Sequence, residues 1–318
     1  MQVINQTTVN EFLLLGFQNL YGFKIFFFFV VLVSFLGTIC GNLLIIWLVA
    51  SVCSLQSPMY FFLTQLSFSD LILTATIVPN TLYILWDEGG TMSFSGCIFQ
   101  YYFFACSEAS ECFLLSIMAY DRYLAICYPL RYVTLMNNVL CIKLAIASWL
   151  SSFSIVLIDT ISITQLQFCG SYIIDHFFCD FTPLLELACS DTYFLEIELL
   201  ILCIPVAVSP LIIIILSYIY IVQAVLRISS NSERGKAFST CSSHLTVVSI
   251  FYGTLIGSYM IPSKGKSLAV SKVVSLLYTV VTPMINPIIY SLRNKDIKDA
   301  MRKKILKTMN HFKIGSVS

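Results

Sequence analysis

Residues 25–69, IFFFFVVLVSFLGTICGNLLIIWLVASVCSLQSPMYFFLTQLSFS, contain no charged side chain over 45 consecutive positions. A helix that crosses the hydrocarbon core of a bilayer needs about 20 apolar residues, so this run is too long for one crossing and long enough for two. Ser, Gln and Pro gather at its centre, in SVCSLQSPM (51–59), which is the composition of a turn. The stretch therefore predicts two membrane-spanning helices joined by a short loop.

The rest of the chain continues this pattern. The protein has 318 residues, of which 58% are hydrophobic and only 11% are charged, and its net charge is +1. Further apolar segments follow at about 96–120, 140–161, 197–226, 237–261 and 269–292. They are continuous runs, without the alternation of membrane β-strands. We predict an all-α membrane protein with a bundle of seven transmembrane helices, and the small net charge gives no indication of nucleic-acid binding.

Lysine and arginine residues indicate the orientation of this bundle, because cytoplasmic segments of membrane proteins carry an excess of them. Seven spans place the two termini on opposite sides of the membrane. With the N-terminus outside, 14 of the 18 basic residues are cytoplasmic, and Lys24, Lys264, Lys266 and Lys272 are not. We expect an extracellular segment at 1–23, a seven-transmembrane domain at 24–292 and a cytoplasmic tail at 293–318.

The N-terminal stretch MQVINQTTVNEFLLLGF (1–17) lacks the basic region and the cleavage site of a signal peptide. We expect the first span to serve as an uncleaved signal-anchor. Asn5 begins the triplet Asn-Gln-Thr, an N-glycosylation sequon that is usable on the outer side.

Cysteine positions agree with this orientation. Four of the 12 cysteines, Cys97, Cys169, Cys179 and Cys189, fall in the outer region, where the compartment is oxidising. Four cysteines permit two disulfides in any of three pairings. We interpret the other eight as small apolar filler within the membrane and the cytoplasmic segments.

The cytoplasmic tail carries a short amphipathic pattern. In KDIKDAMRKKILKTMNHFK (295–313), the apolar residues Ile297, Ala300, Met301 and Ile305 have the spacing of one helical face, with lysines around them. This predicts a helix on the anionic inner leaflet, with membrane lipids as its partner. A disordered basic tail is the alternative.

Charged residues within the apolar segments are costly and usually functional. Asp121 and Arg122, in MAYDRYLAIC (118–127), fall at the cytoplasmic end of the third span. Snorkelling of Arg122 to the interface would be the structural explanation. Asp70 and Glu111 would lie deeper, where two nearby carboxylates can share a proton or a cation.

Four stretches place these charges in a recognisable pattern: PMYFFLTQLSFSD (58–70), MAYDRYLAICYPLRY (118–132), KAFSTCSSHL (236–245) and PMINPIIYSLRN (283–294). The Asp-Arg-Tyr triplet, together with NPIIY (286–290) at the inner end of the seventh span, resembles the rhodopsin-like G-protein-coupled receptors. The full set, which spreads over nearly the whole chain, is similar to the odorant receptors.

The resemblance implies a switch at the inner ends of the spans. Arg122 would be restrained at rest by Asp121 and by polar groups at the start of span six. On activation Arg122 would meet Tyr218, Tyr290 and the C-terminal helix of a stimulatory G protein. The missing N–H of Pro287 would let the last turn of span seven move. The matching positions are Asp121, Arg122, Tyr123, Tyr218, His244, Asn286, Pro287 and Tyr290.

The resemblance also implies a polar site and two disulfides. Matching positions for a sodium-binding site are Asn42, Asp70, Glu111 and Asn286. A protonated carboxyl pair with a purely structural role is the alternative. The disulfides would be Cys97–Cys179, which ties span three to the second outer loop, and Cys169–Cys189, which is typical of odorant receptors.

A ligand cavity is implied among the outer halves of spans three, five, six and seven. Its matching positions are Phe104, Ala105, Glu108, Ala109, Leu202, Val206, Tyr252, Leu255, Tyr259, Tyr278 and Thr279. Glu108 departs from the family, whose members usually have a small or neutral residue there. We hypothesise that the ligand carries a hydrogen-bond donor or a basic nitrogen. In the alternative, Glu108 is protonated and completes the polar network around Glu111.

The expected function is that of an odorant receptor that raises cAMP and has no enzymatic activity. We expect a multi-pass protein of the plasma membrane, in the cilia of sensory neurons by resemblance, with sodium as its one implied ion. A transporter would be expected to show inverted repeat halves, and a channel a ring of charged residues; the sequence shows neither. An intramembrane aspartyl protease would need a second aspartate, where this chain has Glu111. HFFC (176–179) and CSSH (241–244) each offer one His and one Cys, which is too few for a metal site.

Overall fold

A computed structural model of the chain describes residues 10–18, 21–169, 172–228, 230–259, 268–294 and 296–304. The predictions for Asn5, Lys264, Lys266 and Ile305 lie outside these residues, and so does the side chain of Tyr259.

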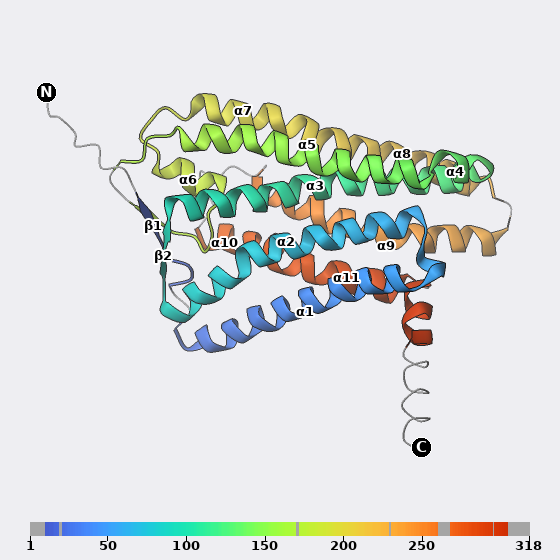
Figure 1. Ribbon diagram of the computed structural model, residues 1–318, viewed down its shortest axis with the longest axis horizontal. Coiled ribbons are helices and arrows are strands. Elements are labelled where there is room, and N and C mark those ends of the chain that lie inside the picture. The colour runs from blue at the N-terminus through green and yellow to red at the C-terminus, as the bar shows by residue number, and fades with distance from the viewer. Residues whose placement is uncertain are drawn as a thin grey trace, which may run out of the picture.

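Long helices run side by side along the longest axis of the molecule (Figure 1). Five of them are continuous: α1 (Lys24–Ser51), α2 (Pro58–Asp87), α3 (Phe94–Cys127), α5 (Asn138–Thr164) and α9 (Asn231–Tyr259). Two are composite: α7 (Tyr193–Cys203), η3 (Ile204–Val208) and α8 (Ser209–Leu226) form one, and α10 (Leu268–Leu276), η4 (Leu277–Val281) and α11 (Thr282–Arg293) form the other. The prediction of a seven-helix bundle is confirmed.

Six of the seven are long and apolar enough to cross a membrane over the described residues, and α9 is the exception. At 29 residues and about 1.5 Å per residue, α9 exceeds the roughly 30 Å of the hydrocarbon core. Its first half, NSERGKAFSTCSSHL, is polar, and α9 extends beyond the neighbouring helices at the inner end (Figure 1). The beginning of this polar half therefore lies beyond the hydrocarbon layer, whereas Cys241 and His244 near its end are buried in the bundle.

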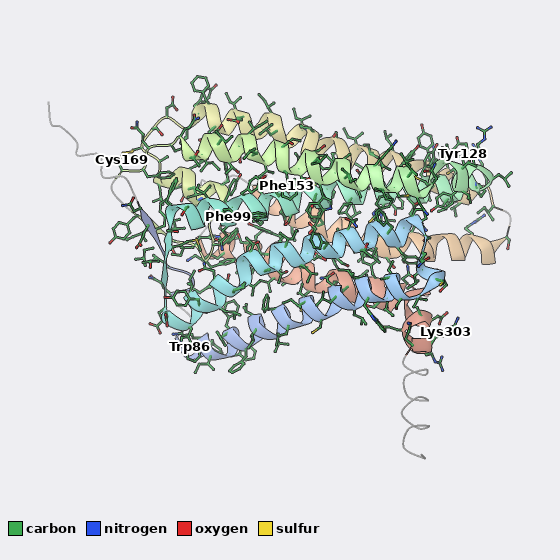
Figure 2. The ribbon with its side chains drawn as sticks, in the orientation of Figure 1. Trp86, Phe99, Tyr128, Phe153, Cys169 and Lys303 are labelled. Carbon is green, nitrogen blue, oxygen red and sulfur yellow. A yellow bond between two sulfur atoms is a disulfide. The ribbon has the colours of Figure 1, made fainter. Side chains whose placement is uncertain are left out.

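Helix α3 occupies the centre of the bundle and contacts α2, α5, α8 and α9. In the most apolar 18-residue stretch of α3, 72% of the residues are buried. The corresponding share is 22% in α1 and 17% in the α7–α8 span. The outer helices instead expose apolar side chains on the surface that would face lipid. Figure 2 shows Trp86 near the outer end and Tyr128 near the inner end, both exposed, as expected for the aromatic belts of a membrane protein.

Two composite spans contain π-helical turns, η3 and η4. Extra residues in a helical turn shift the face that the following helix presents, and such turns are frequent at functional sites. In α11, Pro287 lies against Gly41 of α1, where an added Cβ would come within 2.9 Å of the proline ring. Gly41 is therefore required for the close approach of these two helices.

Short elements close the inner end of the bundle. They are η2 (Cys53–Leu55), α4 (Pro129–Leu135) and a helix at residues 296–304. The last of these confirms a helix after span seven. Its apolar residues Ile297 and Ala300 are buried in the main core of the bundle, so they face protein and not the lipid that we expected. The Tyr60 hydroxyl donates to Asp296 at 2.9 Å and fastens this helix to α2.

A small sheet covers the outer end. Its strand order is β2 (Gly90–Ser93), β1 (Glu11–Leu14) and β3 (Ile173–Ile174), with β1 antiparallel to β2 and parallel to β3. Phe12 and Leu14 are fully buried on one face of β1. Strands of two to four residues are too short to reveal a period of two in the sequence, so no strand is predicted there. The short elements η1 (Tyr21–Phe23) and α6 (Phe181–Leu187) complete this end.

Two disulfides hold the outer loop. Cys97–Cys179 joins the first turn of α3 to the loop, and Cys169–Cys189 closes a segment within it. Both pairings that the resemblance implies are confirmed.

A partly buried ion pair also joins three outer segments. Lys272 of α10 lies 2.5 Å from Asp175 and donates a hydrogen bond of 2.6 Å to the carbonyl of Gly16. His176 follows directly, 2% exposed, with its ring stacked on Phe177. Burial, with the nearby Lys272 ammonium, lowers the pKa of His176 to about 3.

We predict that acid destabilises the outer end through His176. An unfolded histidine titrates near 6.5 and the folded one near 3, so the unfolded state binds more protons between these values. The contribution is complete above about pH 6.5 and is lost as the pH falls, by at most about 1.4 kcal/mol per pH unit. Thermal unfolding of the purified protein between about pH 5 and pH 7 measures this dependence. A His176→Phe variant, which keeps the stacked ring, should flatten the dependence; equal slopes would contradict the assignment.

Candidate functional site

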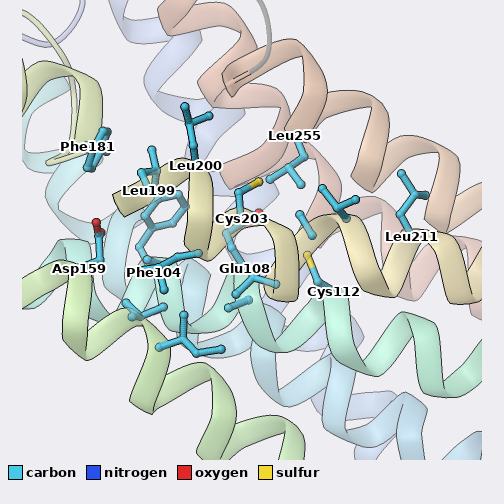
Figure 3. A pocket seen from close by; sticks show the side chains of 18 of the residues that line it. Phe104, Glu108, Cys112, Asp159, Phe181, Leu199, Leu200, Cys203, Leu211 and Leu255 are labelled. Carbon is cyan, nitrogen blue, oxygen red and sulfur yellow. The ribbon is translucent and has the colours of Figure 1, made fainter. Parts of the chain in front are cut away.

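A cavity of about 270 Å³ lies in the outer half of the bundle, between α3, α5, α6, the α7–α8 span and α9. Its wall is mostly apolar (Figure 3). The cavity is lined by eight of the predicted ligand residues: Phe104, Ala105, Glu108, Ala109, Leu202, Val206, Tyr252 and Leu255.

One face of α3 forms a continuous wall of the cavity. Tyr101, Ala105, Glu108 and Cys112 all line it, and their spacing of four, three and four residues is that of one helical stripe. Cys112 lies a turn deeper than Glu108, so the cavity extends along α3 toward the middle of the membrane. This stripe places Glu108 in the wall because of helix geometry alone.

The π-helical turn η3 supplies the opposite wall. Val206, Ala207 and Val208 are consecutive residues of this turn, and all three line the cavity. In a regular α-helix, three successive residues spread over about 200° and would not share a face. The wider turn lets them do so, and the Tyr252 hydroxyl of α9 donates to the Ala207 carbonyl at 3.4 Å.

Two predicted residues lie elsewhere. Tyr278 donates a hydrogen bond to Asp180 at 3.1 Å and packs against Phe104 from outside the cavity. Thr279 donates to the Ser275 carbonyl within its own helix. Neither is among the described residues that line the cavity.

Asp159 is a cavity residue that the motif comparison did not reveal. It lies on α5, is 3% exposed, and accepts a hydrogen bond from the Tyr101 hydroxyl. The sequence could have indicated Asp159, because it and Lys143 are the two charged residues of that membrane span. Phe181, Leu199 and Cys203 also line the cavity, and their apolar character does not distinguish them from packing residues.

Glu108 is a partly buried carboxyl that makes no hydrogen bond to another described residue. Glu111 and Asp180, the charged groups that act on it, are both acidic. No lysine or arginine is among the described residues that line the cavity. The cavity therefore offers acceptors and negative potential within an apolar wall.

A polar cluster lies deeper, below the cavity. Asn286 of α11 donates to both carboxyl oxygens of Asp70 of α2, at 3.1 and 3.3 Å. Glu111 of α3 interacts directly with Asp70, and Asn42 of α1 donates to the carbonyls of its own helix and of α11. The structure thus brings the four predicted residues together from four helices.

This cluster contains oxygen atoms without partners. The Oε1 atom of Glu111 and the Oδ1 atom of Asn42 are buried, and neither accepts a hydrogen bond from any described residue. A small hard cation takes oxygen ligands, so the donor set fits a sodium ion. Among the described residues, no group of three or more His, Cys, Asp or Glu side chains is arranged to hold a metal.

At the inner end of α3, Arg122 pairs with Asp121, with Nη2–Oδ2 at 2.5 Å and Nε–Oδ2 at 3.0 Å. The second carboxyl oxygen accepts from the Tyr132 hydroxyl of α4 at 2.7 Å. Burial, and then the Asp121 carboxylate, raises the pKa of Tyr132. Asp121 is fully buried and Arg122 nearly so, so the pair is desolvated and held in one geometry.

Of the other predicted switch residues, Asn286 binds Asp70 in the polar cluster and Pro287 lies against Gly41, whereas the remaining four lie toward the inner end of the bundle. The Tyr218 hydroxyl lies 2.8 Å from Nδ1 of His244, whose Nε2 lies 3.2 Å from the Leu115 carbonyl. Tyr290 is 1% exposed, and its hydroxyl has no hydrogen-bond partner among the described residues. The Tyr123 ring lies 5.7 Å from the ring of Tyr220 of α8 and is tilted by 47° to it.

Comparison with known proteins agrees with this arrangement. The sequence profile of the olfactory receptor family matches residues 27–308. Human olfactory receptor 11L1 is 48% identical over 303 residues, which is 95% of this chain and 94% of that protein. Human olfactory receptor 5G3 is 47% identical over 96% of this chain and 97% of its own length. The dog olfactory receptor-like protein OLF4 is 46% identical over 95% of this chain and 97% of its own length.

Proposed function

This chain belongs to the olfactory receptor family, and we propose that it binds a small, largely apolar odorant in the outer cavity and activates a stimulatory G protein that raises cAMP. As a member of this family it is a multi-pass protein of the plasma membrane, it has an odorant and a G protein as partners, and it is not an enzyme.

One observation carries the proposal: a single buried helix connects the cavity with the inner charge pair. Glu108 lines the cavity and Arg122 lies 14 residues later on α3, which is about 21 Å along the axis. A ligand that contacts α3, α8 and α9 together can favour one arrangement of these helices over another. It shifts the equilibrium only by its difference in affinity for the two arrangements.

The inner contacts are those expected of a resting arrangement. Arg122 is held by Asp121, and Tyr218 is held by His244. On activation, we propose that Arg122 leaves Asp121 and meets Tyr218 and Tyr290, opening a site for the C-terminal helix of the G protein. The Tyr290 hydroxyl, which has no partner among the described residues, would gain one. A buried ion pair suits such a switch because its desolvation cost nearly offsets its attraction.

We predict that Arg122→Ala abolishes the odorant response, because the G protein loses its central cationic contact. The measurement is cAMP accumulation against a broad odorant panel at matched surface expression, with an expected loss of about tenfold or more in maximal response. Lys143→Ala is the matched control, because Lys143 is an exposed cation on α5. This variant should respond normally. A full response from Arg122→Ala would contradict the coupling role.

Within the cavity, we propose that Glu108 accepts a hydrogen bond from a donor or basic nitrogen of the odorant. Glu108→Gln removes the charge and keeps the shape. We predict that this variant lowers the potency of amines by about tenfold, since hydrogen bonds to charged groups contribute roughly 1.5–3 kcal/mol. Esters and hydrocarbons of similar size should keep their potency. Unchanged potency for amines and alcohols alike would favour the alternative, in which Glu108 completes the network around Glu111.

We also propose that a sodium ion binds among Asp70, Glu111 and Asn42, where it would supply positive charge to the unpaired oxygens. Asp70 and Asn286 would hold the site between α2 and α11, and Glu111 would link it to α3. A bound ion that contacts three helices stabilises the arrangement in which they meet.

The prediction is that sodium chloride raises the melting temperature of the purified receptor more than choline chloride of equal concentration, because ligand binding to the folded state stabilises it. Glu111→Gln should remove the difference, and Glu108→Gln should retain it. A wild-type receptor that melts equally in both salts would contradict the sodium site and favour the protonated carboxyl pair.

A further inference from the structure

The cavity contains a second carboxyl group that the Glu108 hypothesis does not use. Asp159 is 97% buried and lines the same cavity as Glu108, from a different helix. One of its oxygens accepts the Tyr101 hydroxyl, and the other, Oδ1, has no hydrogen-bond partner among the described residues. Leaving a buried acceptor of this kind unpaired costs about 1–3 kcal/mol or more, so Asp159 is poised to accept from a bound molecule.

The two carboxyl groups are separated along the cavity. Figure 3 shows Asp159 at one end, near Phe181, and Glu108 nearer the middle, with Phe104 between them. Asp159 bonds Tyr101, which lies seven residues before Glu108 on α3. Seven residues are about two turns, or roughly 10 Å along the helix. The surface between them is apolar.

Among the described residues, the charged groups that line the cavity or act on its carboxyl groups are all acidic. Asp180 acts on Glu108 and Glu198 acts on Asp159, both through their negative charge. The outer cations Lys24 and Lys272 are already paired with Glu88 and Asp175. A cavity with apolar walls and acidic groups of one sign concentrates positively charged molecules of matching size.

We propose that this receptor recognises a two-headed amine, an alkane chain with an ammonium group at each end, with one end at Glu108 and the other at Asp159. This rests on the proposed function, because it assigns the ligand class of the same cavity. Each ammonium donates to a carboxyl oxygen, and the methylene chain covers the apolar wall between them. A single-headed amine of equal length would leave one carboxyl unpaired, so the second head group adds selectivity as well as affinity.

A purely structural role for Asp159 would be to hold the Tyr101 hydroxyl. Two variants separate the roles. Asp159→Asn removes the anionic acceptor and keeps an oxygen for Tyr101, whereas Tyr101→Phe removes the hydroxyl and keeps the carboxyl. If Asp159 reads the ligand, only the first variant loses the preference for two-headed amines. If Asp159 only positions Tyr101, Tyr101→Phe is the more harmful change.

The experiment is ligand-induced thermal stabilisation of the purified receptor, which requires no G protein. The probes are linear α,ω-diamines of about four to ten carbons, each compared with the n-alkylamine of the same length. We expect the wild type to bind the best diamine about tenfold or more tightly than its monoamine. Binding should peak at one chain length, that of the diamine whose two nitrogens span the distance between the Glu108 and Asp159 carboxyl groups. Asp159→Asn should reduce this ratio to near one while monoamine binding is retained, and Tyr101→Phe should keep it.

Three results would overturn the proposal: equal binding of diamines and monoamines by the wild type, a diamine preference that survives Asp159→Asn, or its loss in Tyr101→Phe alone. The comparison within the wild type tests the proposal even if a variant does not fold. Neutral odorants that raise cAMP while no amine stabilises the receptor would overturn this ligand class and leave the odorant-receptor function standing. Diamine stabilisation without any cAMP response would support the ligand class and count against the coupling.

Discussion

Backbone hydrogen bonding in the absence of water is the constraint on which the rest of this structure depends. In the hydrocarbon core an unpaired N–H or C=O has no solvent partner, so each crossing must be a helix that satisfies its own backbone. Polar side chains then avoid the cost of contact with lipid only by pointing toward the interior of the bundle. Asp70, Glu111 and Asn286 all take it, and each is at most 2% exposed. The lipid-facing surface is left to Phe, Leu, Ile and Val.

Helix α3 concentrates the consequences of this constraint. As the most buried helix, it carries Glu108 in the cavity, Glu111 in the polar cluster and the Asp121–Arg122 pair at the inner end. These groups lie at different depths along one helix. A displacement of the helices that pack against it changes several costly polar contacts together. The structure therefore connects the cavity with the inner charge pair through a single helix.

Irregular turns give the bundle its particular cavity. The π-helical turn at Ile204–Val208 brings three consecutive residues to the cavity. Elsewhere in the bundle, Gly41 permits the close approach of α1 to Pro287. At the outer end, the β1 strand, the Cys97–Cys179 disulfide and the Lys272–Asp175 pair join the N-terminal segment, the outer loop and α10. These features hold the mouth of the bundle, where helix packing alone would be weakest.

The sequence by itself determined the class of the protein, its seven helices, the orientation expected from lysine and arginine, and the two carboxyl groups of the polar cluster, Asp70 and Glu111; Asn42 and Asn286 came from the resemblance. Each follows from local properties: the length of an apolar run, the cost of a charge in lipid, or a motif at a known depth. Both disulfide pairings came from resemblance, since four cysteines allow three. Tertiary structure alone decided that Asp159 shares a cavity with Glu108, that Tyr278 turns to Asp180, and that Ile297 and Ala300 pack on protein. These outcomes depend on the rotation of each helix about its axis, which is set by packing between distant segments and is not encoded in the period of any one of them.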